Sequence, residues 1–308
     1  MWTGYNNYDH FFEVGQPRGV DNWIDEIIST NPENIKVGKE RIWNIPVSFD
    51  IETSSYYKMG EKCATMYLWS MCFNGSSILG RTWKEFTDVI KLIVNIFQTK
   101  KCKLLIFVHN LGYEFQFMRG WFIWENVFAS KERRPIYARL NNGIEFRCSY
   151  ILSNYALAYI GEELLDKYKV EKDVGALDYS LLRNSKTGLT QTEKWYSVHD
   201  VQVVTSYIQE KIEQDGGINE IPLTNTGYVR KYTRDYCFNQ ELQDAKLRKK
   251  SRARYKESMK SLVITSKCEY DQLHQAFAGG FTHANPFWSG KTIKVGDEYE
   301  KIDNINEE

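Results

Sequence analysis

The chain has 308 residues, of which 42% are apolar, and it can therefore bury the core of one large domain or two small ones. Lys and Arg number 40, as do Asp and Glu, and this balance argues against a purely electrostatic nucleic-acid binder. No apolar run reaches the length of a membrane span, and the six cysteines show no metal-ligand spacing, so neither a membrane protein nor a zinc protein is expected.

Residues 1–40 are polar and aromatic and are predicted to form an N-terminal arm. The apolar run 45–53 that follows has strand character and contains Asp50 and Glu52. Strand side chains alternate between faces, so these two carboxylates project to the same side. Adjacent carboxylates repel unless a cation such as Mg²⁺ or Mn²⁺ lies between them. A surface strand with two solvated acids is the alternative interpretation.

The next segments predict alternating strands and helices. Residues 64–83 form a predicted hairpin that turns at Asn74-Gly75, where both positions tolerate positive φ. Apolar residues at helical spacing over 86–97 predict a core-packed helix. The continuous apolar run 103–108 is typical of a central buried strand, and a helix is expected from about Tyr113.

The second half of this region continues the same pattern. Segments 136–140 and 144–148 predict a second hairpin, and 156–168 predicts a helix. A capping-box sequence begins a long helix over about 190–214. The order of these elements favours an α/β domain on a mixed sheet, and we place this domain at residues 41–220.

The character of the chain changes over residues 221–308. The segment 246–256 is densely basic, and it is interpreted either as a solvated helix face or as a surface that contacts phosphates or a partner. A short strand is expected near 277–282, and the last residues are acidic. We predict that this region is a linker.

Three separate segments place acids next to predicted core elements. Asp50 and Glu52 end the first strand, and Glu114 comes shortly after the most buried strand. Asp200 lies four residues after Tyr196, on the same face of one predicted helix. Such a layout can hold two metal ions about 3.5–4 Å apart around a scissile phosphate, while the tyrosine orients the attacking water. The pattern indicates two-metal phosphodiester hydrolysis.

These segments resemble the Exo I, Exo II and Exo III motifs of DEDD proofreading exonucleases, and most closely those of protein-primed family B DNA polymerases of small tailed phages. The resemblance covers about residues 44–288. Its motifs are Phe49–Thr53, His109–Leu111, Leu177–Tyr179, Tyr196–Asp200 and Ala278–Thr282. It implies a ribonuclease-H-like α/β fold with a mixed sheet and flanking helices. Trp195, where the histidine subclass has His, implies the tyrosine subclass.

The resemblance also implies roles for individual residues. The ligands of two Mg²⁺ or Mn²⁺ ions would be Asp50, Glu52, Glu114 and Asp200. The catalytic residues would be Tyr196, which orients water, and Lys172. Contacts to single-stranded DNA would come from Thr53, His109, Asn110, Tyr113, Phe117, Phe277, Gly279 and Gly280. Core packing is the alternative for Phe117, and a local loop cap is the alternative for His109.

Three positions depart from the family pattern. Glu114 stands where the family usually has Asp, and its extra methylene moves the carboxylate by about 1.5 Å, which weakens or lengthens the contact to the second ion. Val174 stands at the place of the catalytic lysine, and Lys172 is the nearest substitute. Phe277 replaces the tyrosine of the family's Tyr-x-Gly-Gly linker motif, which keeps the ring and loses the hydroxyl.

The palm motif D-x-x-S-L-Y-P, which the family carries shortly after the Gly-Gly-Phe-Thr strand, does not occur before Glu308. We therefore expect the exonuclease part of such a DNA polymerase, as a fragment or as one piece of a split protein, with a linker toward an absent palm. Its expected partners are a primer 3′ end and the polymerase palm, and a terminal protein is a further candidate. Its expected location is the cytoplasm of an infected bacterial host.

Two other interpretations stay open. The site could be catalytically weakened, so that the chain only binds single-stranded DNA or a terminal protein through the basic segment 246–256. Alternatively, the chain could be a free-standing repair or RNA-processing nuclease of the same fold, which the Gly-Gly-Phe-Thr segment disfavours.

Overall fold

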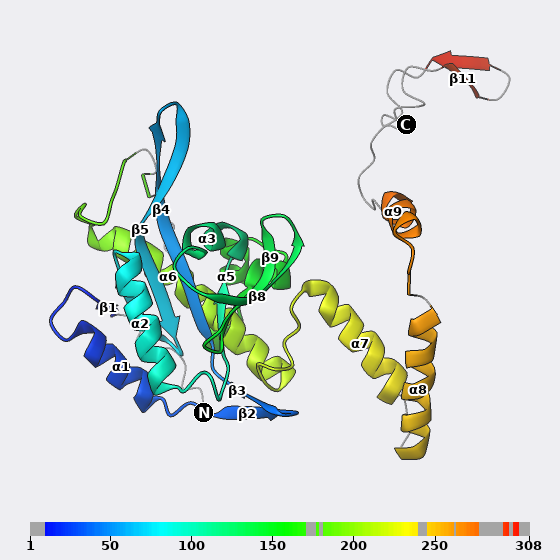
Figure 1. The fold of residues 1–308 in the computed structure, drawn as a ribbon, viewed down its shortest axis with the longest axis horizontal. Coiled ribbons are helices and arrows are strands. Elements are labelled where there is room, and N and C mark those ends of the chain that lie inside the picture. The colour runs from blue at the N-terminus through cyan, green and yellow to red at the C-terminus, as the bar shows by residue number, and fades with distance from the viewer. Residues whose placement is uncertain are drawn as a thin grey trace. The chain divides into compact units, whose positions relative to one another are not determined.

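Two structural units make up the chain in the computed structural model, Met1–Tyr232 and Thr233–Glu308. The structure describes residues 10–170, 177–178, 181–239, 245–261, 263–276, 292–295 and 298–301. The first unit holds a large mixed sheet with helices on both of its faces (Figure 1). The second unit holds described helices and a small hairpin.

The large sheet has eight strands. Their order is β1 (Phe12–Glu13), β6 (Ser76–Gly80), β5 (Glu61–Phe73), β4 (Val47–Lys58), β7 (Leu104–Val108), β10 (Ile144–Cys148), β9 (Arg134–Leu140) and β8 (Trp124–Lys131). The three central strands β4, β7 and β10 run parallel to one another. Antiparallel hairpins extend the sheet on both sides of them, and β1 pairs with β6 in parallel.

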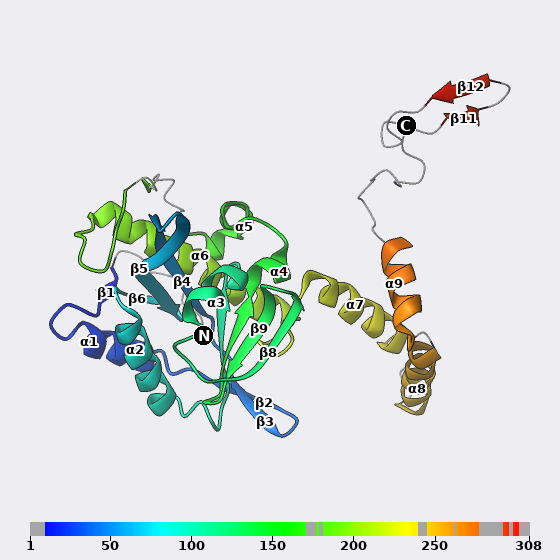
Figure 2. The ribbon, with the colours of Figure 1, turned by 45° about the horizontal axis from the view of Figure 1, so that its top comes forward.

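Helices cover both faces of this sheet (Figure 2). Those of the first unit are α1 (Gly19–Ser29), α2 (Trp83–Ile96), α3 (Leu111–Met118), α4 (Ser149–Ser153), α5 (Leu157–Glu163) and α6 (Gln191–Asp215), with a short 3₁₀ turn at Asp166–Tyr168 and the start of α7 (Asn225–Asn239). Helices α1, α2 and α3 contribute to the core on one face, whereas α5 and α6 contribute to a core on the other. A separate two-stranded sheet pairs β2 (Asn34–Val37) with β3 (Glu40–Trp43).

Alternation along β4 directs its acids to one face of the sheet. Val47, Phe49 and Ile51 belong to the core that includes α1, α2 and α3. Ser48 points the other way and contacts α6 through its hydroxyl. Because strand side chains alternate with a period of two, Asp50 lies on the α6 side as well. The apolar residues of the strand therefore fix the direction in which its carboxylates point.

The local sequence signals match the structure closely. The predicted turn at Asn74-Gly75 has φ of 50° and 97° and joins β5 to β6. Thr82 and Thr190 each form a capping box at the start of a helix, α2 and α6 respectively. Helix α6 ends at Gly216, whose φ is 84°. The predicted α/β fold class is confirmed, and these caps and turns show why its elements begin and end where they do.

The N-terminal residues are more closely integrated than the predicted arm suggests. Strand β1 extends the large sheet, and Lys194 of α6 forms an ion pair with Glu13 at 2.9 Å. Trp23 of α1 is fully buried, and its indole N–H donates to the carbonyl oxygen of Ser76 at 3.2 Å. Residues 10–29 therefore pack onto the sheet, while a separate role for residues 1–40 remains a prediction.

Replacing Trp23 with alanine should destabilise the whole first unit. The change removes a fully buried indole and leaves a cavity, which typically costs about 3–5 kcal/mol of unfolding free energy. Ile28→Ala on the same helix is the control, because Ile28 is 47% exposed and its truncation should cost less than about 0.5 kcal/mol. Chemical denaturation measures both losses of unfolding free energy. A loss for Trp23→Ala as small as that for Ile28→Ala would contradict the packing of α1 in the core.

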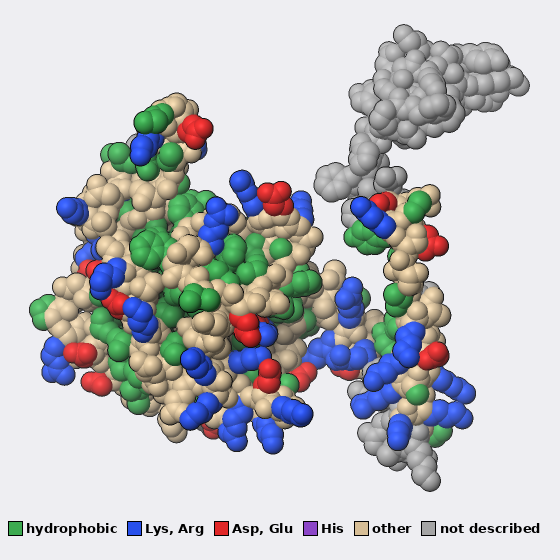
Figure 3. All heavy atoms as spheres, viewed as in Figure 1, with side chains coloured by type: hydrophobic (Ala, Val, Ile, Leu, Met, Phe, Trp, Pro, Cys, Tyr) green, Lys and Arg blue, Asp and Glu red, His purple; other side chains and the backbone are tan. Residues whose placement is uncertain are grey.

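The second unit carries a strongly basic helix. Its described elements are α8 (Ala245–Ser261), α9 (Lys267–Ala276) and the hairpin of β11 (Thr292–Val295) with β12 (Glu298–Lys301). Lys and Arg side chains gather along α8 (Figure 3), and those of Lys249, Arg252 and Lys256 are exposed. Within the described ranges, no helix combines the length and the apolar character needed to cross a membrane.

Candidate active site

Strand β4 supplies two carboxylates to the candidate site. Asp50 and Glu52 alternate with the buried core residues Phe49 and Ile51, which anchor the strand from the opposite face. The pairing of β4 with β5 shifts register between Glu52 and Thr53. Such irregularities change the direction of side chains within a strand, and β4 continues beyond this one to Lys58. Here the shift lies directly beside the acidic pair.

Helix α6 brings a third carboxylate to the same place. One oxygen each of Asp50, Glu52 and Asp200 lies within 4.8 Å of the others. Glu52 and Asp200 are buried, whereas Asp50 is half-buried. Tyr196 lies one helical turn before Asp200 and lines the same pocket. Residues from distant parts of the chain therefore converge as the sequence pattern predicts.

Small buried polar residues hold α6 against the sheet. The hydroxyl of Ser48 donates to the carbonyl oxygen of Val201 at 2.6 Å. The hydroxyl of Ser70 donates to the carbonyl oxygen of Ser197 at 3.0 Å, and the two serine hydroxyls are 3.0 Å apart. Short side chains allow the helix backbone to approach the strands, and the hydrogen bonds fix its position. This contact sets the distance between Asp200 and the strand acids.

Glu114 lies in the first turn of α3 and faces the acidic pair. Its side chain is buried, and burial together with the nearby charge of Asp50 raises the pKa of Glu114 well above its usual range. Among the described residues, no group hydrogen-bonds to its buried Oε2 atom. A buried oxygen without a donor beside other carboxylates is a chemically suitable ligand for a hard cation. The donor set therefore fits Mg²⁺ or Mn²⁺, and the specific role of Glu114 remains a prediction.

A pocket of about 360 Å³ joins these groups. The sequence-predicted residues that line it are Asp50, Glu52, Thr53, Tyr113, Glu114, Tyr196 and Asp200. Thr53 and Tyr113 are hydrogen-bonded through their hydroxyls, so β4 and α3 meet at the pocket. Ser55 also lines it, although no sequence motif points to this residue. A serine without a motif has no signal of its own, and only the length of β4 places it there.

Three predicted DNA-contact residues, His109, Asn110 and Phe117, are not among the residues that line the pocket. His109 follows β7, and its ring lies 3.2 Å from the Ser149 hydroxyl and edge-on to Tyr150. Asn110 is exposed and has φ of 76° at the start of α3. Phe117 is half-buried and contacts the Tyr113 ring with centroids 5.1 Å apart. Their contacts with DNA remain predictions.

Several predicted positions fall outside the described residues. They are Lys172, Phe277, Gly279 and Gly280, together with Tyr179 of the Leu-Asp-Tyr segment. Asp178 of that segment is described, and its carbonyl oxygen accepts a hydrogen bond from Arg183 at 2.7 Å. The predicted roles of the other residues stay untested.

Solved structures of one polymerase match this fold. Phi29 DNA polymerase complexed with single-stranded DNA matches with a TM-score of 0.52 at 15% sequence identity. Its ternary complex with primer-template DNA and incoming nucleotides matches with a TM-score of 0.51 at 16% sequence identity. Its orthorhombic crystal form matches with a TM-score of 0.51 at 17% sequence identity. This chain is similar in fold to phi29 DNA polymerase. The predicted resemblance to protein-primed family B polymerases is thereby confirmed at the level of the fold.

The match is partial for phi29 DNA polymerase. It covers 80% of this chain, and 41% or 42% of the polymerase chain. The present chain therefore corresponds to less than half of the polymerase. No known protein-family model matches the sequence, and no curated protein does either.

Proposed function

We propose that this chain is a 3′→5′ exonuclease that hydrolyses single-stranded DNA ends with two divalent ions. The observation that carries the proposal is the convergence of Asp50, Glu52 and Asp200 with Tyr196 in one pocket. The fold similarity to a DNA polymerase supports it. The pocket is lined by the four carboxyl groups of Asp50, Glu52, Glu114 and Asp200, which suits the metal-assisted cleavage of a flexible strand end.

We assign a separate role to each group of residues that lines the pocket. Asp50, Glu52 and Asp200 hold the ions, with Glu114 as a further ligand of the second one. Such ions supply positive charge that stabilises the pentavalent phosphate of the transition state. The Tyr196 hydroxyl orients the attacking water. Thr53 and Tyr113 contact the terminal nucleotide, and the ring of Tyr113 offers a face for stacking.

The biological setting that we propose is proofreading within a protein-primed DNA polymerase of a phage. The order of the sequence motifs and the similarity to phi29 DNA polymerase support this setting. In that case a polymerase palm and a terminal protein are the partners, and the infected bacterial cytoplasm is the location. Viral DNA replication is then the process in which the nuclease acts.

A labelled single strand tests the activity directly. With Mg²⁺ or Mn²⁺, a 5′-labelled strand should shorten stepwise to a ladder, and a 3′-labelled strand should release labelled mononucleotide at once. Chelation should stop both reactions. A matched RNA strand serves as the comparison, and faster cleavage of RNA would favour an RNA-processing nuclease instead. Early products cut at internal positions, before the 3′ end has been shortened, would contradict exonuclease action.

A second candidate function is DNA or terminal-protein binding without cleavage. The observation that favours it is the exposed basic surface of α8 together with Glu114 in place of the family's Asp. Binding of single-stranded DNA that persists in chelator, without any cleavage in metal, would support this candidate over the first.

Tyr113→Ala should weaken substrate binding more than chemistry. Tyr113 is 42% exposed at the pocket, and stacking of one base on an aromatic ring is worth about 1–3 kcal/mol, which predicts a rise in KM of about 5- to 150-fold. Trp121→Ala is the control, since Trp121 is also half exposed but stacks on Trp83 rather than lining the pocket. Steady-state kinetics on a short strand measure both variants. An equal rise for both would argue against stacking at Tyr113.

A further inference from the structure

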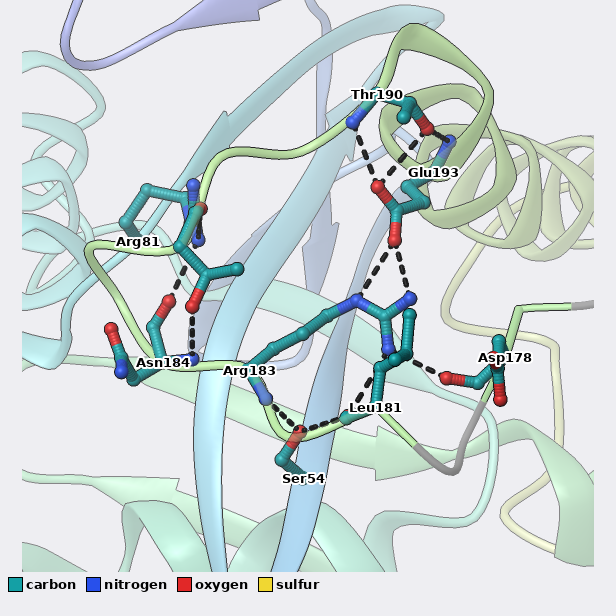
Figure 4. Close-up of polar contacts among 9 residues, drawn as sticks. Ser54, Arg81, Asp178, Leu181, Arg183, Asn184, Thr190 and Glu193 are labelled. Atoms are coloured by element: carbon teal, nitrogen blue, oxygen red, sulfur yellow. Dashed lines mark hydrogen bonds and ion pairs between the residues drawn. The ribbon is translucent and has the colours of Figure 1, made fainter.

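Arg183 is a buried arginine in the segment between Asp178 and α6. Only 5% of the residue is exposed. Its Nε donates to Oε1 of Glu193 at 2.8 Å, and a terminal nitrogen donates to the same oxygen (Figure 4). The other terminal nitrogen donates to the carbonyl oxygen of Asp178 at 2.7 Å. The guanidinium therefore joins the Leu-Asp-Tyr segment to the helix that carries Tyr196.

The backbone of Arg183 contacts the acid-bearing strand as well. Its N–H donates to the hydroxyl of Ser54 at 2.8 Å. Ser54 is buried and lies on β4 two residues after Glu52. One residue thus connects β4, directly beyond its acids, with the first turn of α6. These are the two elements whose separation determines whether Asp200 and Tyr196 reach the strand acids.

The partner Glu193 is itself part of the start of α6. Its backbone N–H donates to the Thr190 hydroxyl at 3.2 Å, and its carboxylate accepts from the Thr190 N–H at 2.7 Å. Burial pushes the pKa of Glu193 upward, but hydrogen bonds from Thr190 and Arg183 outweigh it and lower that pKa overall. Glu193 lies three residues before Tyr196, on the adjacent turn of the helix.

Arg183 is buried and Glu193 is half-buried, and desolvation offsets much of the attraction between such charges, so the pair adds little net stability. The planar guanidinium instead fixes direction, since its donors point along set lines toward their acceptors. The arrangement is therefore better explained if Arg183 positions the first turn of α6 than if it mainly stabilises the fold.

We propose that Arg183 is a positioning residue for the nuclease reaction, which fixes the first turn of α6 and thereby the Tyr196 hydroxyl relative to Asp50 and Glu52. The inference rests on the proposed nuclease function. It adds to that function a residue that lies outside the acidic motifs.

Arg81, which lies between β6 and α2, provides a matched comparison because it contacts the same segment. Its terminal nitrogen donates to the carbonyl oxygens of Asn184 and Thr187 at 2.9 and 2.8 Å, and its Nε donates to that of Tyr67 at 2.7 Å. Arg81 therefore anchors this segment to β5, as Arg183 anchors it to β4. Within the described residues, no hydrogen bond links Arg81 to Glu193. Loss of Arg81 loosens the segment without removing the link to α6.

The test compares single-turnover cleavage of a short DNA strand by the full chain and its variants. Arg183→Lys keeps the charge but loses the forked geometry, and Glu193→Gln keeps a capping side chain but loses the ion pair. We expect each to lower the cleavage rate about 10- to 100-fold, in the range seen when supporting groups around a metal site are removed, with DNA affinity changed less than about twofold. Arg81→Lys should change the rate less than about threefold.

A double-mutant cycle with Tyr196→Phe separates positioning from general loosening. If Arg183 acts through the tyrosine hydroxyl, Arg183→Lys should have little further effect once that hydroxyl is absent. Thermal unfolding of each variant checks folding, and Glu193→Gln serves as the test if Arg183→Lys does not fold. Additive losses, or equal losses from Arg81→Lys, overturn the role of Arg183 while leaving the nuclease function intact. A wild-type chain that cleaves no DNA overturns the proposed function and this inference together.

Discussion

Replacing Asp50 and Glu52 together with alanine is expected to lower DNA cleavage by at least about 1,000-fold. The two carboxylates face the pocket from one strand and, with Asp200, offer the oxygens that a divalent ion requires. A single group that stabilises charge in a transition state is worth about 10²–10³ in rate, and here two are removed. Single-turnover cleavage of a labelled strand measures the loss. Ladder products that persist in the double variant would contradict the proposed site.

The same variant should lose the response of its stability to metal. A ligand that binds only the folded state at 100 times its Kd adds about 2.7 kcal/mol of stability. Mn²⁺ should therefore raise the unfolding temperature of the wild-type chain, and it should not do so in Asp50→Ala/Glu52→Ala. Glu61→Ala is the control, because Glu61 is an exposed acid on β5 of the same hairpin and should keep both cleavage and the metal response. A metal response that survives in the double variant would place the ion elsewhere.

The features that depend on local signals could be predicted from the sequence. The face of Asp50 and Glu52 follows from the alternation of one strand, and Tyr196 and Asp200 share a face because helical residues four apart do. The turn at Asn74-Gly75 likewise depends only on which residues tolerate positive φ. Each of these predictions needs a few neighbouring residues and no knowledge of distant contacts.

Features that depend on contacts between residues far apart in the chain could not be predicted from the sequence. Serine is usually exposed, so the sequence predicts solvent-facing side chains at Ser48, Ser70 and Ser197. All three residues are fully buried between α6 and the sheet. The two-residue strand β1 is too short to show a period. The pairing of Arg183 with Glu193 also depends on how a loop folds back onto a helix, which spacing alone does not reveal.

The proximity of Asp50, Glu52 and Asp200 could be predicted only from the order of several weak sequence motifs. A D-x-E triplet or a Tyr-x-x-x-Asp helix is common by itself. In the structure, Asp200 approaches Asp50 because short side chains let α6 lie close to β4 and β5. This distance is a property of packing, and it is the part of the site for which three-dimensional evidence was needed.

Glu114→Gln is expected to lower cleavage by about 100-fold or more while leaving the metal-free protein no less stable. The substitution keeps the shape of the side chain and removes a carboxyl group that lies buried beside Asp50, where burial and the charge of Asp50 raise its pKa. Without metal, burial and the charge of Asp50 disfavour the ionised form of this group in the folded state, so replacing it with a neutral amide removes that cost. With metal, loss of the carboxylate weakens the binding of the second ion and therefore the stabilisation of the transition state. Cleavage rates and thermal unfolding in chelator measure the two effects separately.

Glu114→Asp is the matched control, since it keeps the carboxylate and draws it back by about 1.5 Å. Its rate should lie between those of wild type and Glu114→Gln if the charge itself is needed. A wild-type rate in Glu114→Gln would show that the second ion uses another ligand. A large loss of stability in that variant would show that Glu114 holds α3 in place rather than serving the pocket, because a structural carboxylate, unlike a metal ligand, would be needed in chelator as well.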